Sequence, residues 1–182
     1  MFEISFTVTT SIVIFGWCLF RIGAYYKNRN LNWKHEAVQL LFLINLLVIN
    51  RMVFHPMATD NGRILPLIFD SSTVWPFRMN LIPFVNLLDY DSKRDLLLNL
   101  IGNTAMFIPT GIMTPLIYKN LNSFKKTVLT GFSISLAIEI IQLPFAVRAS
   151  DVDDLILNTL GCVLGYGILT LVRRIRQRIA VR

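Results

Sequence analysis

The chain has 182 residues, of which 54% are apolar and only 16% are charged. Soluble domains carry about 25% charged residues, so this composition argues against a water-soluble domain and favours a membrane protein. The net charge of +7 does not indicate nucleic-acid binding, because the basic residues lie between long apolar runs instead of forming one surface. We therefore expect a single membrane domain over residues 1–182 and no nucleic-acid partner.

Five apolar runs follow one another along the chain, and a helix that crosses the hydrocarbon needs about 20 such residues. The runs cover residues 4–20 (extended to 26), 37–54, 96–118, 127–147 and 155–172. The first run has no basic segment before it and no small-residue cleavage site after it, so we expect a retained helix. The predicted fold class is all-α, a polytopic membrane protein with about five transmembrane helices.

The segment between the second and third runs, residues 59–94, does not look like a solvated linker. It contains apolar, aromatic and proline residues in close succession, as in Trp75-Pro76-Phe77 and Leu81-Ile82-Pro83-Phe84. Aromatic residues favour the headgroup level of a membrane, and proline prevents one long helix. We expect an outer loop that lies on the membrane interface or dips into it.

The distribution of charge predicts the orientation of the helices. With the carboxy terminus in the cytoplasm, the inner segments hold 12 of the 18 basic residues and one acid, Glu36. The outer segments then hold six basic residues and nine acids. Because lysine and arginine concentrate in cytoplasmic loops, we expect the amino terminus outside and the carboxy terminus in the cytoplasm.

Polar residues at or near the outer ends of the last three runs recur at helical spacing, which predicts a shared ligand-binding site. The expected site residues are Asn99, Asn103, Glu139, Gln142, Arg148, Asp151, Asp154 and Asn158. Glu139 lies eight residues below Val147, so its expected depth in the outer half of the membrane is roughly 12 Å. Asn103 lies eight residues below Asp95 and is expected at the same depth. A charge at the bilayer centre costs about 2.5–3.5 kcal/mol, which favours an outward-opening polar pocket over exposure to lipid.

Structural roles compete with this interpretation at several positions. Two pairs fit a capping box before an apolar run: Ser92 with Asp95, and Ser150 with Asp153. Arg148 is either an interfacial anchor paired with Asp151 or a group that holds a phosphate or carboxylate at the mouth of the pocket. His35 and His55 are assigned to loops without a functional role.

Small and acidic residues near the end of the chain raise two further questions. Gly161 and Gly165 form a small-xxx-small motif, which predicts close packing between helices. The aspartates from Asp151 to Asp154, with Glu139, could hold a divalent cation, but they lack the spacing of an EF-hand loop, so a site without metal is favoured. We also expect no cofactor.

The order and spacing of several motifs resemble the VanZ-like family of bacterial membrane proteins, over a region of residues 80–170. The motifs are Asn80-Leu81-Ile82-Pro83-Phe84, Asn99 with Asn103, Phe107-Ile108-Pro109-Thr110-Gly111, Glu139-x-x-Gln142, Arg148-x-x-Asp151-Val152-Asp153-Asp154, Asn158, Gly161 and Gly165. A phenylalanine is usual in the family where this chain has Thr110. The resemblance implies a multi-pass protein of the Gram-positive cell envelope with a role in low-level resistance to teicoplanin and related lipoglycopeptide antibiotics.

Two classes of function fit these residues. The first is a non-enzymatic protein that binds a lipid-linked wall precursor or a lipid-tailed antibiotic in the outward pocket. The second is an intramembrane enzyme acting on a lipid or polyprenyl phosphate, with Glu139 or Asp154 as general acid or base. The first is favoured because no nucleophile–base pair is evident. A transporter is less favoured because no inverted repeat is visible, and assembly into a homo-oligomer stays open.

Overall fold

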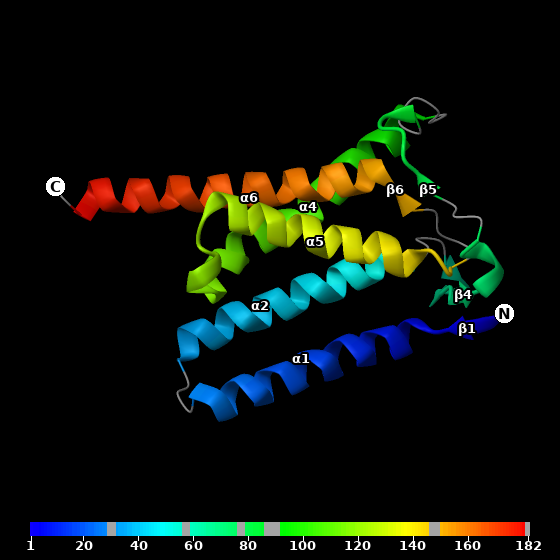
Figure 1. Cartoon of the computed structure of the whole chain (residues 1–182), viewed down its shortest axis with the longest axis horizontal. Helices are drawn as coiled ribbons and strands as arrows, with labels where there is room; N and C mark the ends of the chain where they lie inside the picture. The colour runs from blue at the N-terminus through cyan, green and yellow to red at the C-terminus, as the bar shows by residue number, and fades with distance from the viewer. Residues whose placement is uncertain (29–31, 56–58, 76–78, 86–91, 146–149, 181–182) are drawn as a thin grey trace. The chain divides into compact units, whose positions relative to one another are not determined.

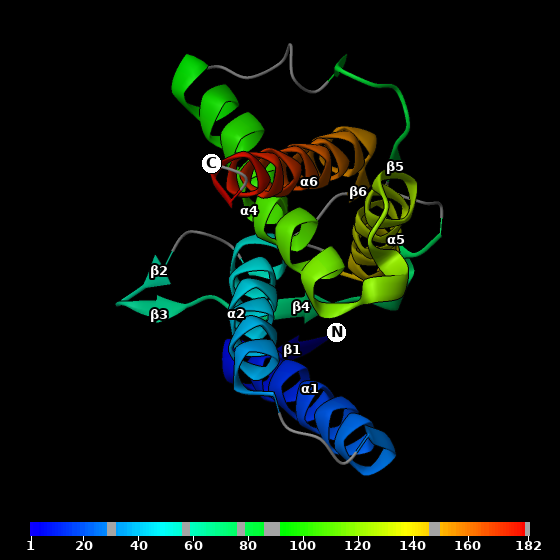
Figure 2. The same cartoon turned by 90° about the vertical axis from the view of Figure 1, so that its left-hand side faces the viewer.

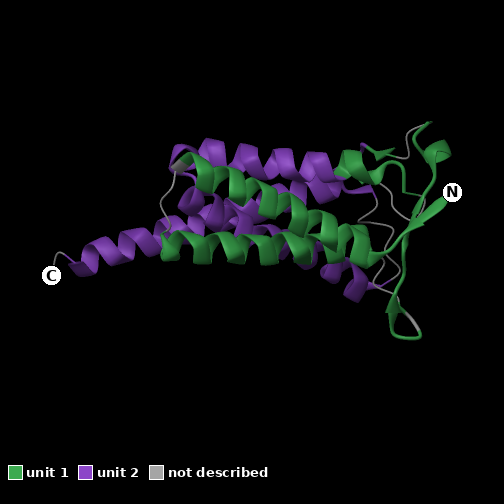
Figure 3. Ribbon diagram, turned by 90° about the horizontal axis from the view of Figure 1, so that it is seen from below, with its two compact units in different colours: residues 1–80, 139–150 green, residues 81–138, 151–182 purple. Residues whose placement is uncertain are grey.

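The computed structural model describes residues 1–28, 32–55, 59–75, 79–85, 92–145 and 150–180. It consists of two compact units (Figure 3). Unit 1 contains Met1–Asn80 and Glu139–Ser150, and unit 2 contains Leu81–Ile138 and Asp151–Arg182. Helix α5 therefore contributes residues to both units.

Unit 1 is built on two antiparallel helices, α1 (Phe6–Asn28) and α2 (Trp33–Ile49) (Figure 1). Asn32 begins α2, because its side chain accepts hydrogen bonds from the backbone N–H groups of Lys34 and His35. Arg21 donates to Glu36 and links the two helices near their connection. The last turn of this second span widens into a π-helix, η1 (Asn50–Phe54).

The predicted outer loop contains short strands, which the all-α prediction did not include. β1 (Phe2–Ile4) pairs antiparallel with β4 (Leu67–Phe69), and β2 (Thr59–Asp60) pairs with β3 (Arg63–Ile64) (Figure 2). Asn61 and Gly62, both with positive φ, form the turn between β2 and β3, as expected for an Asn-Gly hairpin. The remaining short elements are η2 (Ser71–Thr73), β5 (Met79–Asn80) and β6 (Ser150–Asp151), with β5 and β6 as the third strand pair.

Unit 2 is built on α4 (Lys93–Ile117) and α6 (Val152–Ala180), with α5 (Phe124–Gln142) beside them. A short 3-10 turn, η3 (Lys119–Leu121), follows α4. The glycines of α6 show that it runs parallel to α4, because Gly161 faces Thr104 and Gly165 faces Ile108. Helices α5 and α6 are antiparallel, because Gly131 faces Cys162 and Ser135 is bonded to Asn158.

Of the five long helices in the described part of the chain, four are long and apolar enough to cross a membrane. These spans are Phe6–Lys27, Trp33–Phe54, Lys93–Ile117 and Val152–Ala180, so the protein is a multi-pass membrane protein. The predicted fourth span is also helical, as α5, but it carries Lys125, Lys126 and Glu139 within 19 residues. Because α5 has only 19 residues, every 18-residue stretch of it contains all three charges, whereas each of the other four helices has an 18-residue stretch with at most two.

The end of α5 corrects one prediction. The apolar run continues to Val147, but the helix ends at Gln142. The turn that follows contains Pro144, whose carbonyl accepts from the backbone N–H of Asp70 at 2.8 Å. Glu139 is therefore three residues from the end of its helix, about 5 Å along the axis. The prediction, which ended the helix at Val147, placed it eight residues from that end.

Candidate functional site

Unit 2 brings polar side chains of three helices together. Asn103 on α4 donates from Nδ2 to Asp154 Oδ1 at 2.5 Å. One turn further along α6, Asn158 donates from Nδ2 to Ser135 Oγ of α5 at 2.9 Å. Because Asp154 and Asn158 are four residues apart on one helix face, this face of α6 receives polar partners from both neighbouring helices.

The start of α6 is held by a second group of hydrogen bonds. The backbone N–H of Phe84 donates to Asp153 Oδ1 at 2.8 Å, and Phe84 has a positive φ of 68°. A bulky residue in that conformation is strained, and such strain is often found at functional sites. The predicted capping by Ser150 is wrong, because Asp151 Oδ1 accepts from the backbone N–H of Asp153 at 2.9 Å and takes that role.

Two buried oxygen atoms of unit 2 have no hydrogen-bond partner among the described residues: Asp153 Oδ2 and Asn158 Oδ1. Their side chains are 3% and 2% exposed. A buried acceptor without a donor costs about 1–3 kcal/mol, and more if it is charged. An ordered water or a donor group of a bound molecule would remove this cost.

Glu139 belongs to unit 1 and is buried, with 3% of its surface exposed. Ser150 donates from Oγ to Glu139 Oε2 at 2.8 Å, which explains why Ser150 does not cap α6. Gln142, one turn further along α5, donates from Nε2 to the Val53 carbonyl at 3.0 Å. The π-turn η1 carries this carbonyl, and such turns are frequent at functional sites.

The remaining predicted site residues are only partly described. Asn99 is half-buried on α4, one turn before Asn103. Arg148 lies outside the described residues, so its role as anchor or anion ligand stays a prediction. The predicted convergence of Glu139 with Asn103 and Asn158 joins residues of different units and also stays a prediction.

A polar cluster in unit 1 was missed by sequence reasoning. His55, assigned to a loop without function, is fully buried. Its Nδ1 lies 3.2 Å from the carbonyl of Leu65, and its Nε2 lies 2.9 Å from Thr9 Oγ1. Asn50 donates from Nδ2 to the same hydroxyl at 3.2 Å. Amide side chains in the second apolar run, Asn45 and Asn50, were the available signal, because polar groups inside a membrane helix need partners.

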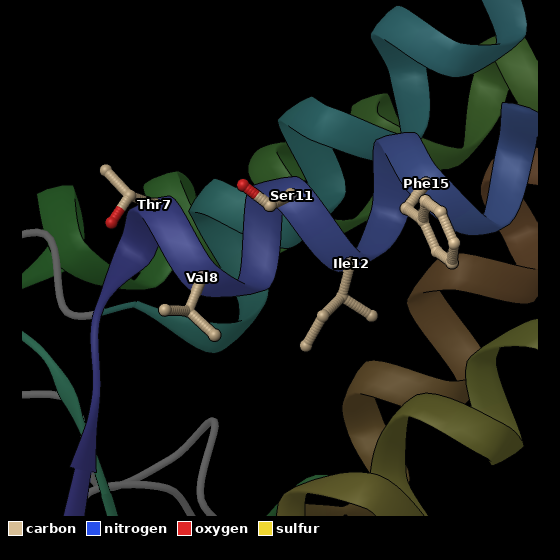
Figure 4. Close-up of a pocket in the computed structure, with 5 residues that line it drawn as sticks. All are labelled: Thr7, Val8, Ser11, Ile12 and Phe15. Carbon is tan, nitrogen blue, oxygen red and sulfur yellow. The ribbon is translucent and has the colours of Figure 1, made fainter.

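A cavity of about 460 Å³ lies along α1, and its lining contains none of the predicted site residues. It is lined by Thr7, Val8, Ser11, Ile12 and Phe15, all of them on one helix (Figure 4). Among the residues that the structure describes, no group of three or more His, Cys, Asp or Glu side chains could hold a metal ion.

The family model for VanZ/LLP1 matches residues 40–173, which is more than half of the chain. The chain belongs to the VanZ/LLP1 family. The part of this VanZ/LLP1 protein that matches begins within α2, whereas the resemblance described above rested on residues from Asn80 onward. The matched region, residues 40–173, includes every predicted site residue and both packing glycines.

A curated relative, "Protein VanZ" of Enterococcus faecium, is 38% identical to this VanZ/LLP1 chain over 72 residues. The alignment covers 38% of the chain and 44% of the relative, so it spans less than half of either protein. No solved structure matches the chain significantly.

Proposed function

We propose that this VanZ/LLP1 protein binds a lipid-tailed or lipid-linked molecule of the bacterial cell envelope at an outward-facing polar site. The observation that carries the proposal is the set of polar side chains on three helices of unit 2, joined by the Asn103–Asp154 and Ser135–Asn158 hydrogen bonds. Polar and ionisable groups among membrane helices are costly, and they commonly mark binding sites.

The unpartnered acceptors of Asp153 and Asn158 suggest the chemistry of the bound group. Hydroxyl and ammonium groups are donors, so either would complete these hydrogen bonds. A head group with such donors would meet the polar side chains, while its lipid tail would lie against the apolar surface of the helices. Arg148, if it lies at the mouth as predicted, would hold a phosphate or carboxylate of the same molecule.

The family resemblance gives this site a role. Teicoplanin-type lipoglycopeptides carry a lipid tail, and wall precursors carry a lipid anchor, so both reside where an outward-facing site of a membrane protein would meet them. We propose that binding of one of them lowers susceptibility to these antibiotics. The proposal places the protein in the cell membrane of a Gram-positive bacterium.

Co-purification tests this function directly. Protein extracted from a Gram-positive host in mild detergent is expected to carry a bound lipid-linked molecule, detected by native mass spectrometry. Asn158→Val should remove most of it, because the valine provides no polar atom. Asn120→Val is the matched control: Asn120 is exposed in η3, at the other end of α4 from the predicted site.

Two outcomes would count against binding without turnover. Equal amounts of bound molecule in both variants would show that Asn158 takes no part in binding. A change in the mass of the bound molecule during incubation would favour the intramembrane enzyme, with Glu139 or Asp154 as general acid or base.

We also propose five membrane crossings, with α5 as the fourth. Since α4 and α6 run parallel and α5 runs antiparallel to α6, a chain that crosses in α4 and again in α6 has to return between them. The charges of α5 are compatible with this return. Lys125 and Lys126 lie at its first turn, and Glu139 lies at its last.

Reporter fusions test the number of crossings. A reporter after Arg182 is expected in the cytoplasm and one inserted near Asn61 outside, because three crossings separate the two positions. If α5 does not cross, only two crossings separate them, and both reporters would be on the same side.

A further inference from the structure

The last two turns of α6, residues 173–180, form what is here called the terminal segment (the red end of α6 in Figure 1). Helix α6 has 29 residues, a length of about 43 Å at 1.5 Å per residue. The hydrocarbon core of a membrane is about 30 Å thick, and Val152–Val172 already spans it. The terminal segment therefore extends beyond the hydrocarbon.

The terminal segment is strongly basic, and no acid occurs in the sequence after Asp154. Arg173 donates to Asn122 Oδ1 at 2.8 Å and is thereby held by the connection between α4 and α5. Arg174, Arg176 and Arg178 are exposed, and the structure gives them no ion pair with any described residue. Three cationic side chains are thus available to a partner.

Apolar side chains lie between these arginines. Ile175 and Ile179, one turn apart, are 48% and 69% exposed. At 3.6 residues per turn, Arg176 and Arg178 fall roughly 60–100° to either side of Ile175. An apolar strip with flanking cationic residues is typical of helices that bind the membrane interface.

We propose that the terminal segment binds anionic phospholipid headgroups where α6 leaves the membrane. The isoleucines enter the boundary between headgroups and acyl chains, and Arg174, Arg176 and Arg178 contact lipid phosphates. A second copy of the chain is the less suitable partner for this strip, because pairing would bring two sets of arginines together. An anionic surface instead complements the charge.

The proposal is tested on the full-length protein by asking whether the lipid shields the apolar strip, Ile175 and Ile179, from a chemical label. Ile179→Cys is reconstituted in nanodiscs of phosphatidylcholine, alone or with phosphatidylglycerol in equal amount, and labelled with a membrane-impermeant maleimide. The parent protein, with its own Cys18 and Cys162, gives the background. Each basic residue near an anionic surface contributes about fivefold to binding, so three predict up to about a hundredfold slower labelling with phosphatidylglycerol.

Two further variants separate charge from folding. The triple substitution Arg174→Gln, Arg176→Gln and Arg178→Gln should remove the protection by phosphatidylglycerol, whereas the corresponding triple lysine variant should keep most of it. Equal labelling rates in both lipids would overturn the proposal, as would equal protection of the triple glutamine variant. Protection that depends on two copies per disc, and not on lipid charge, would assign the strip to a homodimer.

Discussion

Replacing Gly161 with leucine is expected to remove most of the folded protein from the membrane. The Cα of Gly161 packs directly on α4, and a Cβ at this position would clash with the Thr104 carbonyl oxygen and crowd Phe107. The clash involves backbone, which cannot rotate away, so α4 and α6 have to separate. Overpacking of this kind costs about 1–3 kcal/mol, which corresponds to about 5- to 150-fold in the ratio of folded to unfolded protein.

The same helix offers a matched control for this substitution. Gly167 is also on α6, but a Cβ there would meet nothing within 4 Å. Gly167→Leu should therefore accumulate like the parent, and Gly165→Leu should behave like Gly161→Leu, since its Cβ would meet the Ile108 carbonyl. Membrane abundance and monodispersity in detergent measure the effect. Normal abundance of Gly161→Leu would refute close packing as the role of this glycine.

The substitution Glu139→Gln is expected to abolish protection against teicoplanin while leaving the protein at normal abundance. Glu139 is buried and accepts a hydrogen bond from Ser150, and glutamine can accept the same bond through its Oε1 atom. The substitution keeps the size of the side chain and removes the charge of an ionised carboxylate, which is costly within a membrane. Any loss of function would then come from the missing charge and not from misfolding.

Susceptibility of a Gram-positive host that expresses each variant is the measurement, with membrane abundance determined in parallel. Ser150→Ala is the matched control, because it removes the hydrogen bond to Glu139 and keeps the carboxylate. We expect it to retain most of the protection. If Glu139→Gln protects as well as the parent, the buried acid has a structural role, and its predicted part in the binding site is wrong.

Helix positions were largely predictable because length and composition are local properties. All five apolar runs correspond to helices, and four of these, α1, α2, α4 and α6, are suited to cross a membrane. The small-xxx-small spacing also predicted that Gly161 and Gly165 would pack closely. The sequence could not identify the partner helix as α4, since that depends on contacts between residues more than 50 positions apart.

Errors arose where a side chain had more than one partner to choose from. Ser150 fitted a helix cap by its spacing, but in the fold its hydroxyl reaches Glu139, and Asp151 caps α6 instead. The apolar run continues to Val147, but α5 ends at Gln142, where Pro144 disfavours further helix and its carbonyl accepts a hydrogen bond from Asp70.

The sequence by itself determined the multi-pass membrane class, the family and the residue types available for a polar site. Apolar run length, charge asymmetry and motif spacing carry that information without reference to any partner. Only the tertiary structure decided that Asn103 binds Asp154, that Asn158 binds Ser135 and that His55 is buried. A polar group in a membrane protein has to find a hydrogen-bond partner, and which partner it finds depends on how distant helices pack.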